Sequence, residues 1–263
     1  MPKQRDATVA GDGERRRGTE FLHGALRRMG YEILRYRSPG EKEADRELGE
    51  DDLRRARVLG HRRISLVLDV GADGGQYGVR LRKSGYAGRI VSFEPRPDAF
   101  AQLEAAAGAD PEWECRRLAL GRSEGSAEIN VSRNAHSSSL LPMAERHRAV
   151  APRSAYVGTE EVAVARLDSL WEELNGSGDR VFLKLDTQGF ELEVLAGAED
   201  ALPSVIGIEA ELSLVPLYEG APTYLELIGQ LDQRGFRLAG FEPELADPGT
   251  GELLQANGIF VRD

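Results

Sequence analysis

Short apolar runs alternate with amphipathic stretches along the chain from residue 64 onward. Uninterrupted apolar runs are typical of strands buried on both faces, and the stretches between them have apolar residues at helical spacing. This alternation predicts a parallel sheet covered by helices on both faces. The predicted strands are Ile64–Val70, Ile90–Phe93, Trp113–Leu118, Val181–Leu185, Val205–Leu212, Phe236–Phe241 and Gln255–Val261, and the predicted helices are Gln76–Ser84, Pro97–Ala107, Phe190–Ala201 and Thr223–Arg234.

The last two predicted strands have no helix between them. A turn-rich stretch at residues 247–251 joins them, which indicates a hairpin and places one antiparallel strand at the end of the sheet. Parallel strands followed by a terminal hairpin are typical of the Rossmann-like class I methyltransferase fold. We therefore expect an α/β domain with a mostly parallel seven-stranded sheet and helices on both faces.

The alternation stops between residues 122 and 170. Two strand-like pieces, Ala127–Ser132 and Val162–Leu167, flank a polar segment at 134–157. Long insertions in compact domains are usually functional loops. We expect a substrate-binding or lid element here, within a domain that covers residues 64–263.

Residues 1–63 have a different pattern. Residues 1–18 are charged, rich in glycine and without periodicity, which predicts a disordered leader. A helical pattern at 21–33 and a charged helix at Glu41–Leu59 predict a helical cap over residues 19–63. These helices are the candidate surface for a homodimer.

The charge of the chain excludes some partners. The net charge is −10, and residues 64–263 carry 18 of the 34 basic and 32 of the 44 acidic residues. An acidic domain repels phosphate backbones, which disfavours a nucleic-acid partner.

The apolar runs are far shorter than the ~20 residues of a membrane span, and the first residues lack a secretory signal. The single cysteine, Cys115, leaves no internal disulfide or cysteine-based zinc cluster. We expect a cytoplasmic protein.

The strongest local signal is a glycine turn. An apolar strand ends at Val70, and residues 71–75 form a turn before a helix that begins near Gln76. Glycines at 71 and 75 permit close approach of a ligand, and a helix start offers N–H groups. Asp73 replaces the second glycine of the dinucleotide fingerprint, so the turn opposes a pyrophosphate and suits a ligand with ammonium and sulfonium groups.

A carboxylate follows the next predicted strand. Glu94 lies 23 residues after Gly71, and Pro95 fixes the direction in which the chain leaves the strand. A carboxylate at this position can accept both hydroxyls of a ribose, and Asp69 adds negative charge nearby. The pattern favours S-adenosylmethionine over a nicotinamide dinucleotide.

These stretches resemble the FkbM family of S-adenosylmethionine-dependent methyltransferases, over residues 64–263 and more weakly over the leader. The resemblance rests on residues 69–77, 92–97, 119–121, Asn134 with 137–141, 166–168, 183–191, 194–198, 211–213 and 217–220. The family usually has Asn where this chain has Asp73, and often Asp where it has Asn257. The candidate cofactor-binding residues are Asp69, Gly71, Ala72, Asp73, Gly75, Tyr77, Glu94, Pro95 and Ala119.

A second group of candidates follows the fourth long strand. Lys184 and Asp186 share one face of the strand, at the carboxyl edge of the sheet that borders a ligand crevice. The alternative is a structural ion pair. Gln188 and Glu191 lie at the start of the next helix. If these carboxylates converge, Lys184 holds one of them ionised or a divalent cation such as Mg²⁺ bridges them, with Asp186 and Glu211 as its ligands.

Glu209 and Glu211 share a face near the end of the fifth strand. Two like charges on an apolar strand are costly without partners, and one of them can serve as a base of raised pKa. Glu211 lies in a stretch that resembles the family. For Glu209 the alternative is a strand end that leaves the core and faces solvent.

The insertion adds Asn134, His136 and three serines at 137–139. A histidine beside hydroxyls suggests a nucleophile and its base, but the sequence lacks the G-x-S-x-G elbow of hydrolases. His136 is a candidate base, with an exposed loop histidine as the alternative. The substrate-binding candidates are Asn134, Ser138, Gln188, Glu191 and Tyr218.

The resemblance implies O-methylation of a hydroxyl on a sugar, polyketide or similar small metabolite. Alignment of the acceptor supplies up to ~7–11 kcal/mol, and a base adds about 10²–10⁴-fold. The hypothesis is that Glu94 and the glycine turn hold the cofactor. Asp186, oriented by Lys184 and helped by Glu211 or His136, receives the proton. The alternatives are a non-catalytic cofactor-binding protein and an NAD-dependent oxidoreductase, the latter opposed by the glycine spacing and the terminal hairpin.

Overall fold

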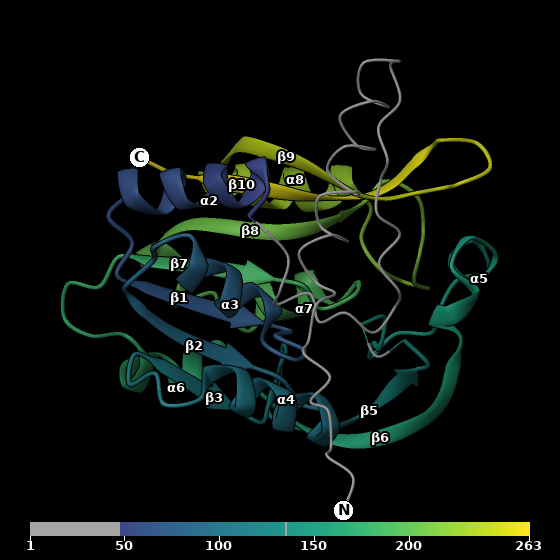
Figure 1. Cartoon of the computed structure of the whole chain (residues 1–263), viewed down its shortest axis with the longest axis horizontal. Helices are drawn as coiled ribbons and strands as arrows, with labels where there is room; N and C mark the ends of the chain where they lie inside the picture. Colours follow the sequence, from purple (N-terminus) through teal and green to yellow (C-terminus); the bar gives the residue numbers. More distant parts are fainter. Residues whose placement is uncertain (1–47, 135) are drawn as a thin grey trace, which may run out of the picture. The chain divides into compact units, whose positions relative to one another are not determined.

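A seven-stranded sheet forms the centre of the chain in the computed structural model, which describes residues 48–134 and 136–263 (Figure 1). The predicted leader and the first predicted helix of the cap lie outside the described residues. The sheet order is β3-β2-β1-β7-β8-β10-β9, and Figure 1 shows it running from β3 at the bottom to β9 at the top. The strands are β1 (Leu66–Val70), β2 (Arg89–Phe93), β3 (Trp113–Arg116), β7 (Val181–Leu185), β8 (Val205–Ser213), β9 (Arg237–Ala246) and β10 (Leu253–Val261).

The strand directions confirm a mostly parallel sheet with a hairpin. β1 pairs in parallel with both β2 and β7 along its full length. β10 pairs antiparallel with both β8 and β9, so β9 runs in the same direction as β8. The antiparallel strand therefore lies one position in from the edge and not at the end of the sheet, because its hairpin partner β9 occupies the outermost position.

Helices cover both faces of the sheet, as the continuous apolar strands predict. Neighbouring residues of a strand point to opposite faces, so β1 contributes to two separate core clusters. Leu66 and Leu68 pack with α6 (Leu167–Leu174), α7 (Glu191–Ala196) and α8 (Tyr224–Gln233), while Val67 packs with α2 (Glu50–His61), α3 (Gln76–Lys83) and α4 (Pro97–Ala107). The single-turn 3₁₀ helix η3 (Leu202–Ser204) leads into β8.

The helix boundaries have local causes. α8 begins where Thr223 and Glu226 cap each other through their side chains and backbone N–H groups. α6 was not predicted, because its first half falls within a stretch that was interpreted as insertion and strand, up to residue 170. α7 ends at Ala196, five residues before the predicted end.

The insertion forms a small sheet of its own. Its three strands are β4 (Ala119–Leu120), β5 (Gly125–Ser132) and β6 (Tyr156–Ala165), in the order β4-β6-β5. The two predicted strand pieces are confirmed in β5 and β6, although both strands are longer than predicted. The polar segment between them contains α5 (Glu145–Val150) and a 3₁₀ turn, η2 (Pro152–Ser154).

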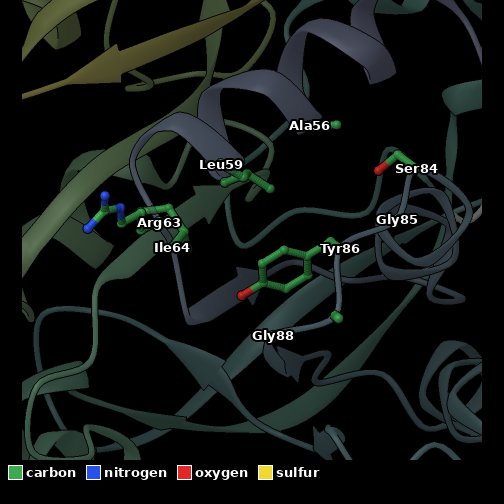
Figure 2. A pocket seen from close by; sticks show the side chains of 10 residues that line it. Ala56, Leu59, Arg63, Ile64, Ser84, Gly85, Tyr86 and Gly88 are labelled. Atoms are coloured by element: carbon green, nitrogen blue, oxygen red, sulfur yellow. The ribbon is translucent and has the colours of Figure 1, made fainter.

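One pocket lies at the amino ends of the parallel strands, away from the candidate site (Figure 2). It is lined by the last turns of α2, by Ile64 before β1, and by the turn from Ser84 to Gly88 before β2. Ligands of open α/β sheets bind at the opposite, carboxyl ends of the strands. In the described part of the chain, every helix is too short or too polar to cross a membrane.

Candidate active site

The glycine turn lies where the sequence predicts it, directly after β1. Gly71 has a φ of +76°, and a Cβ atom at this position would lie 1.9 Å from the backbone oxygen of Asp186. A Cβ at Gly75, whose φ is +85°, would lie 3.0–3.1 Å from Ala106 and Leu103 of α4. Close packing against the backbone therefore requires glycine at 71, and the left-handed conformation disfavours any other residue at 75, reasons that the sequence interpretation did not contain.

Glu94 connects the tip of β2 to the glycine turn. Its Oε2 accepts the backbone N–H of Asp73 and its Oε1 accepts the backbone N–H of Arg96, each at 2.9 Å. Burial outweighs these bonds and raises the pKa of Glu94 to about 7. Each oxygen keeps a lone pair, so the carboxylate fits the two hydroxyls of a ribose at this position.

Asp73 already has partners of its own. Its Oδ2 accepts a hydrogen bond from Gln76 Nε2 at 2.9 Å and lies 2.8 Å from Nδ1 of His136. Burial acts to raise the pKa of Asp73, but the hydrogen bond and charge of His136 outweigh it and lower the pKa to about 2. His136, with a side chain that is 61% exposed, thus joins the insertion to the glycine turn.

Lys184 joins three parts of the site. Its Nζ donates to the backbone oxygen of Gly71 at 2.9 Å, lies 3.1 Å from Asp69 Oδ1 and lies 3.4 Å from Asp186 Oδ2. Burial alone would lower the pKa of Lys184, but the negative charges of Asp69 and Asp186 raise it above its usual value. Asp69 itself is fully buried, and its other oxygen accepts a hydrogen bond from Ser92.

Gln188 bridges the two carboxylates of the predicted catalytic group. Its Nε2 donates to Asp186 Oδ1 at 2.7 Å and to Glu211 Oε1 at 2.9 Å, and its Oε1 accepts a hydrogen bond from the hydroxyl of Tyr218. Burial, with the charges of Asp186 and Glu244, raises the pKa of Glu211 well above its usual range. This shift favours the protonated form of Glu211, whereas Asp186 has the ammonium of Lys184 beside it.

The other substrate-binding candidates make contacts within the protein. The side chain of Asn134 is hydrogen-bonded to Ser132, Ser137 and Ser154, all within the insertion. Ser138 accepts a hydrogen bond from Arg96 Nη1 at 3.2 Å, which brings the insertion to the tip of β2.

Glu191 holds the turn that precedes α7. It is 2% exposed and accepts the backbone N–H groups of Thr187 and Gly189. Gln188 lies within this turn, with a φ of +54°, so the hydrogen bonds of Glu191 fix the backbone on which Gln188 is placed.

The remaining cofactor candidates lie at the same edge of the sheet. Ala72 and Ala119 are buried in core clusters, and Pro95 is half-buried. Tyr77 is also buried, and its hydroxyl donates to Glu209 Oε2 at 2.9 Å. The hydroxyl thus contacts a side chain of β8.

The alternative that Glu209 faces solvent is wrong. Its side chain is 4% exposed and forms two hydrogen bonds with Arg55 of α2, at 2.7 and 2.8 Å. Arg55 was missed in the sequence, although it lies four residues before Leu59 and thus on the apolar side of its helix. A basic residue at such a position is a signal for a buried acidic partner.

A divalent cation does not fit between Asp186 and Glu211. The amide nitrogen of Gln188 donates to both carboxylates and so fills the position that a bridging cation would take. Among the described residues, no group of three or more histidine, cysteine, aspartate or glutamate side chains is arranged to hold a metal ion.

Several solved structures of methyltransferases are similar to this chain. Magnesium protoporphyrin IX methyltransferase from Synechocystis PCC 6803 with bound SAM is 11% identical, with a TM-score of 0.46 over 97% of this chain and 100% of that one. A putative methyltransferase from Thermobifida fusca YX is 13% identical, with a TM-score of 0.41 over 81% and 79%. A putative RNA methyltransferase from Pyrococcus horikoshii is 13% identical, with a TM-score of 0.45 over 92% and 98%.

The family of this chain is shown by its sequence. No curated protein sequence matches the chain. The model of the methyltransferase FkbM domain matches residues 69–238, which is well over half of the chain. The matched segment contains the glycine turn, Glu94, Lys184, Asp186 and Glu211. The chain belongs to the FkbM family of S-adenosylmethionine-dependent methyltransferases.

Proposed function

We propose that this chain is an O-methyltransferase that acts on a hydroxyl of a small metabolite, such as a sugar or a polyketide. The observation that supports it most is the position of Lys184, whose ammonium bonds the glycine turn at Gly71 and lies beside Asp186. One cation thereby holds the end of β1, where the cofactor is expected, against the proposed proton acceptor at the end of β7.

Glu94 and the glycine turn hold the cofactor in this proposal. The two lone pairs that remain on Glu94 accept the ribose hydroxyls. S-adenosylmethionine supplies a methyl group that is already activated by a positively charged sulfur. The protein therefore has to align the acceptor oxygen and to receive its proton, and alignment alone supplies up to ~7–11 kcal/mol.

Asp186 receives the proton of the acceptor hydroxyl. Lys184 balances its negative charge, and the raised pKa of Glu211 disfavours a second negative charge beside it. Gln188 donates to both acids, and Tyr218 fixes the orientation of its amide. His136 is paired with Asp73, so we assign it to the closure of the insertion over the turn and not to proton transfer.

The acceptor is a small molecule in this proposal. The excess of acidic residues over residues 64–263 opposes a nucleic acid. The segment 136–141 of the insertion contacts the glycine turn, the tip of β2 and the turn after β7. The insertion therefore lies where it can enclose an acceptor next to Asp186.

The first experiment is calorimetry with S-adenosylhomocysteine and, separately, with NAD. We expect binding of S-adenosylhomocysteine and none of NAD. Binding of NAD alone would overturn the proposal in favour of an oxidoreductase.

The second experiment measures transfer of a labelled methyl group to a panel of sugar and polyketide alcohols. Asp186→Asn should leave the affinity for S-adenosylhomocysteine nearly unchanged and lower turnover about 10²–10⁴-fold, because the amide cannot accept the proton. Asp232→Asn, on the exposed face of α8, is the matched control and should retain full turnover. Cofactor binding without transfer to any alcohol would favour a non-catalytic protein.

A further inference from the structure

A buried arginine joins α2 to the sheet beside the proposed site. Arg55 is 5% exposed, and its guanidinium donates to both oxygens of Glu209, to Glu242 Oε2 at 2.9 Å and to Asp52 Oδ1 at 3.1 Å. Glu209 and Glu242 are themselves buried. Arg55 is thus the cation bound to the Glu209 carboxylate, while Glu242 also lies 3.7 Å from Nη1 of Arg54.

Tyr77 links this cluster to Lys184. The Tyr77 hydroxyl donates to Glu209 Oε2, and the centre of its ring lies 5.2 Å from Arg55 Cζ and also 5.2 Å from Lys184 Nζ. Both cations therefore contact one aromatic ring. Tyr77 therefore lies beside both Lys184 and Glu209, the acid that Arg55 binds.

Glu209 is also the direct cross-strand neighbour of Lys184. The two residues are register partners on β7 and β8, and paired positions on adjacent strands point to the same face of a sheet. The charge of Glu209 contributes to the raised pKa of Lys184. The lysine side chain is a flexible stem with a point charge, so it can turn toward a stronger partner.

Loss of the Arg55 charge would change the balance of electrostatic attraction on the Lys184 ammonium. Glu209 would be left buried with the Tyr77 hydroxyl bonded to it but without its cation, and a buried carboxylate without a cation is strongly disfavoured. Lys184 is the cation on the adjacent strand. Its ammonium would move toward Glu209 and away from Gly71 and Asp186.

We propose that Arg55 is a positioning residue of the methyl-transfer site, which keeps Lys184 on Gly71 and Asp186 by holding the charge of Glu209. This inference rests on the proposed function, because it assumes that Lys184 and Asp186 act in methyl transfer. Arg55 and Glu242 lie outside residues 69–238, the segment that matches the family. The positioning of Lys184 by Arg55 therefore depends on residues that the family match does not include.

Two variants separate positioning from simple structural support. Arg55→Met and Glu209→Gln both remove the ion pair between α2 and β8, but only Arg55→Met leaves the Glu209 carboxylate without its cation. The chain has four lysines, at positions 3, 42, 83 and 184, so NMR of lysine labelled with ¹⁵N at Nζ gives few side-chain signals. Comparison with Lys184→Met assigns the signal of Lys184.

We expect Arg55→Met to shift the Lys184 signal and to weaken S-adenosylhomocysteine binding about tenfold, or about 1.4 kcal/mol. Glu209→Gln should leave the signal in place and change the affinity by less than about twofold. Equal effects of the two variants on the signal and the affinity would overturn the proposal, because a purely structural ion pair predicts that result.

A double variant keeps the test decisive if Arg55→Met does not fold. In Arg55→Met/Glu209→Gln the charge of Glu209 is removed together with that of Arg55, and we expect the Lys184 signal at its wild-type position. A displaced Lys184 in the double variant would refute the proposal. The NMR result does not depend on catalysis. If the wild-type chain binds no S-adenosylhomocysteine, the proposed function fails while the position of Lys184 is still tested.

Discussion

Gly71→Ala is the substitution that tests the geometry of the site most directly. The new Cβ would lie 1.9 Å from the backbone oxygen of Asp186, whereas real Cβ atoms essentially never approach closer than 3.0 Å. The ends of β1 and β7 must therefore separate by at least 1.1 Å, the difference between these two distances. Both sides of the clash are backbone, so no flexible side chain can absorb it.

The magnitude follows from two costs. A residue with a Cβ pays roughly 1–2 kcal/mol in the left-handed conformation, and overpacking costs about 1–3 kcal/mol, so the free energy of unfolding should fall by about 2–5 kcal/mol. The movement also separates Lys184 from Gly71 or from Asp186. A misplacement of about 1 Å near reacting groups can cost 10²-fold in rate.

Gly197→Ala is the matched control. Its Cβ would lie 1.9 Å from the backbone oxygen of Gly121, at a φ of −89° and among residues that are not part of the candidate site. We expect both variants to unfold at lower urea concentration, and only Gly71→Ala to lose affinity for S-adenosylhomocysteine. The reasoning is refuted if Gly71→Ala binds as the wild type does, or if Gly197→Ala loses binding to the same extent.

Three further predictions concern single side chains. Because Glu94 ionises near pH 7, the affinity for S-adenosylhomocysteine, measured by calorimetry, should rise between pH 6 and 8. Glu94→Gln should bind at least about tenfold more weakly, and its affinity should not change with pH over this range. Tyr218→Phe leaves Gln188 Oε1 without its donor and should lower the free energy of unfolding by about 0.5–1.5 kcal/mol in urea; no loss would contradict the hydrogen bond. Burial raises the pKa of Glu242 from 4.5 to about 7, so the folded chain holds a proton that the unfolded chain has lost, and the free energy of unfolding should fall as pH rises through this window. Glu242→Gln should make that slope shallower, and an unchanged slope would show that Glu242 does not titrate there.

The central strands could be predicted from the sequence because both of their faces are buried. All residues of β1 and β7 are buried, so each strand is apolar except for one charged residue, Asp69 in β1 and Lys184 in β7. β9 lies at the edge and is mostly exposed, so the pattern showed only part of Arg237–Ala246. The hairpin at the end of the sheet was predicted, but not which of its two strands is outermost, because the sequence of a strand does not specify which neighbours it pairs with.

The same limit applies to the site. Glu94, Lys184 and Asp186 were found because they lie at or just beyond strand ends, which a pattern of apolar runs locates. The pairing of Arg55 with Glu209 joins residues 154 positions apart, and no periodicity links them. The bridging role of Gln188 was also missed, since it depends on a left-handed turn that places one amide between two acids.

The place of β10 between β8 and β9 affects how the chain is made. Leu254, Ala256, Ile259 and Phe260 of this strand are fully buried, so the sheet is incomplete until residues 253–261 have left the ribosome. Until then β8 exposes an unpaired edge to other nascent chains. A fragment cut at residue 238, where the family match ends, would keep that edge permanently open, and we expect it to aggregate rather than fold.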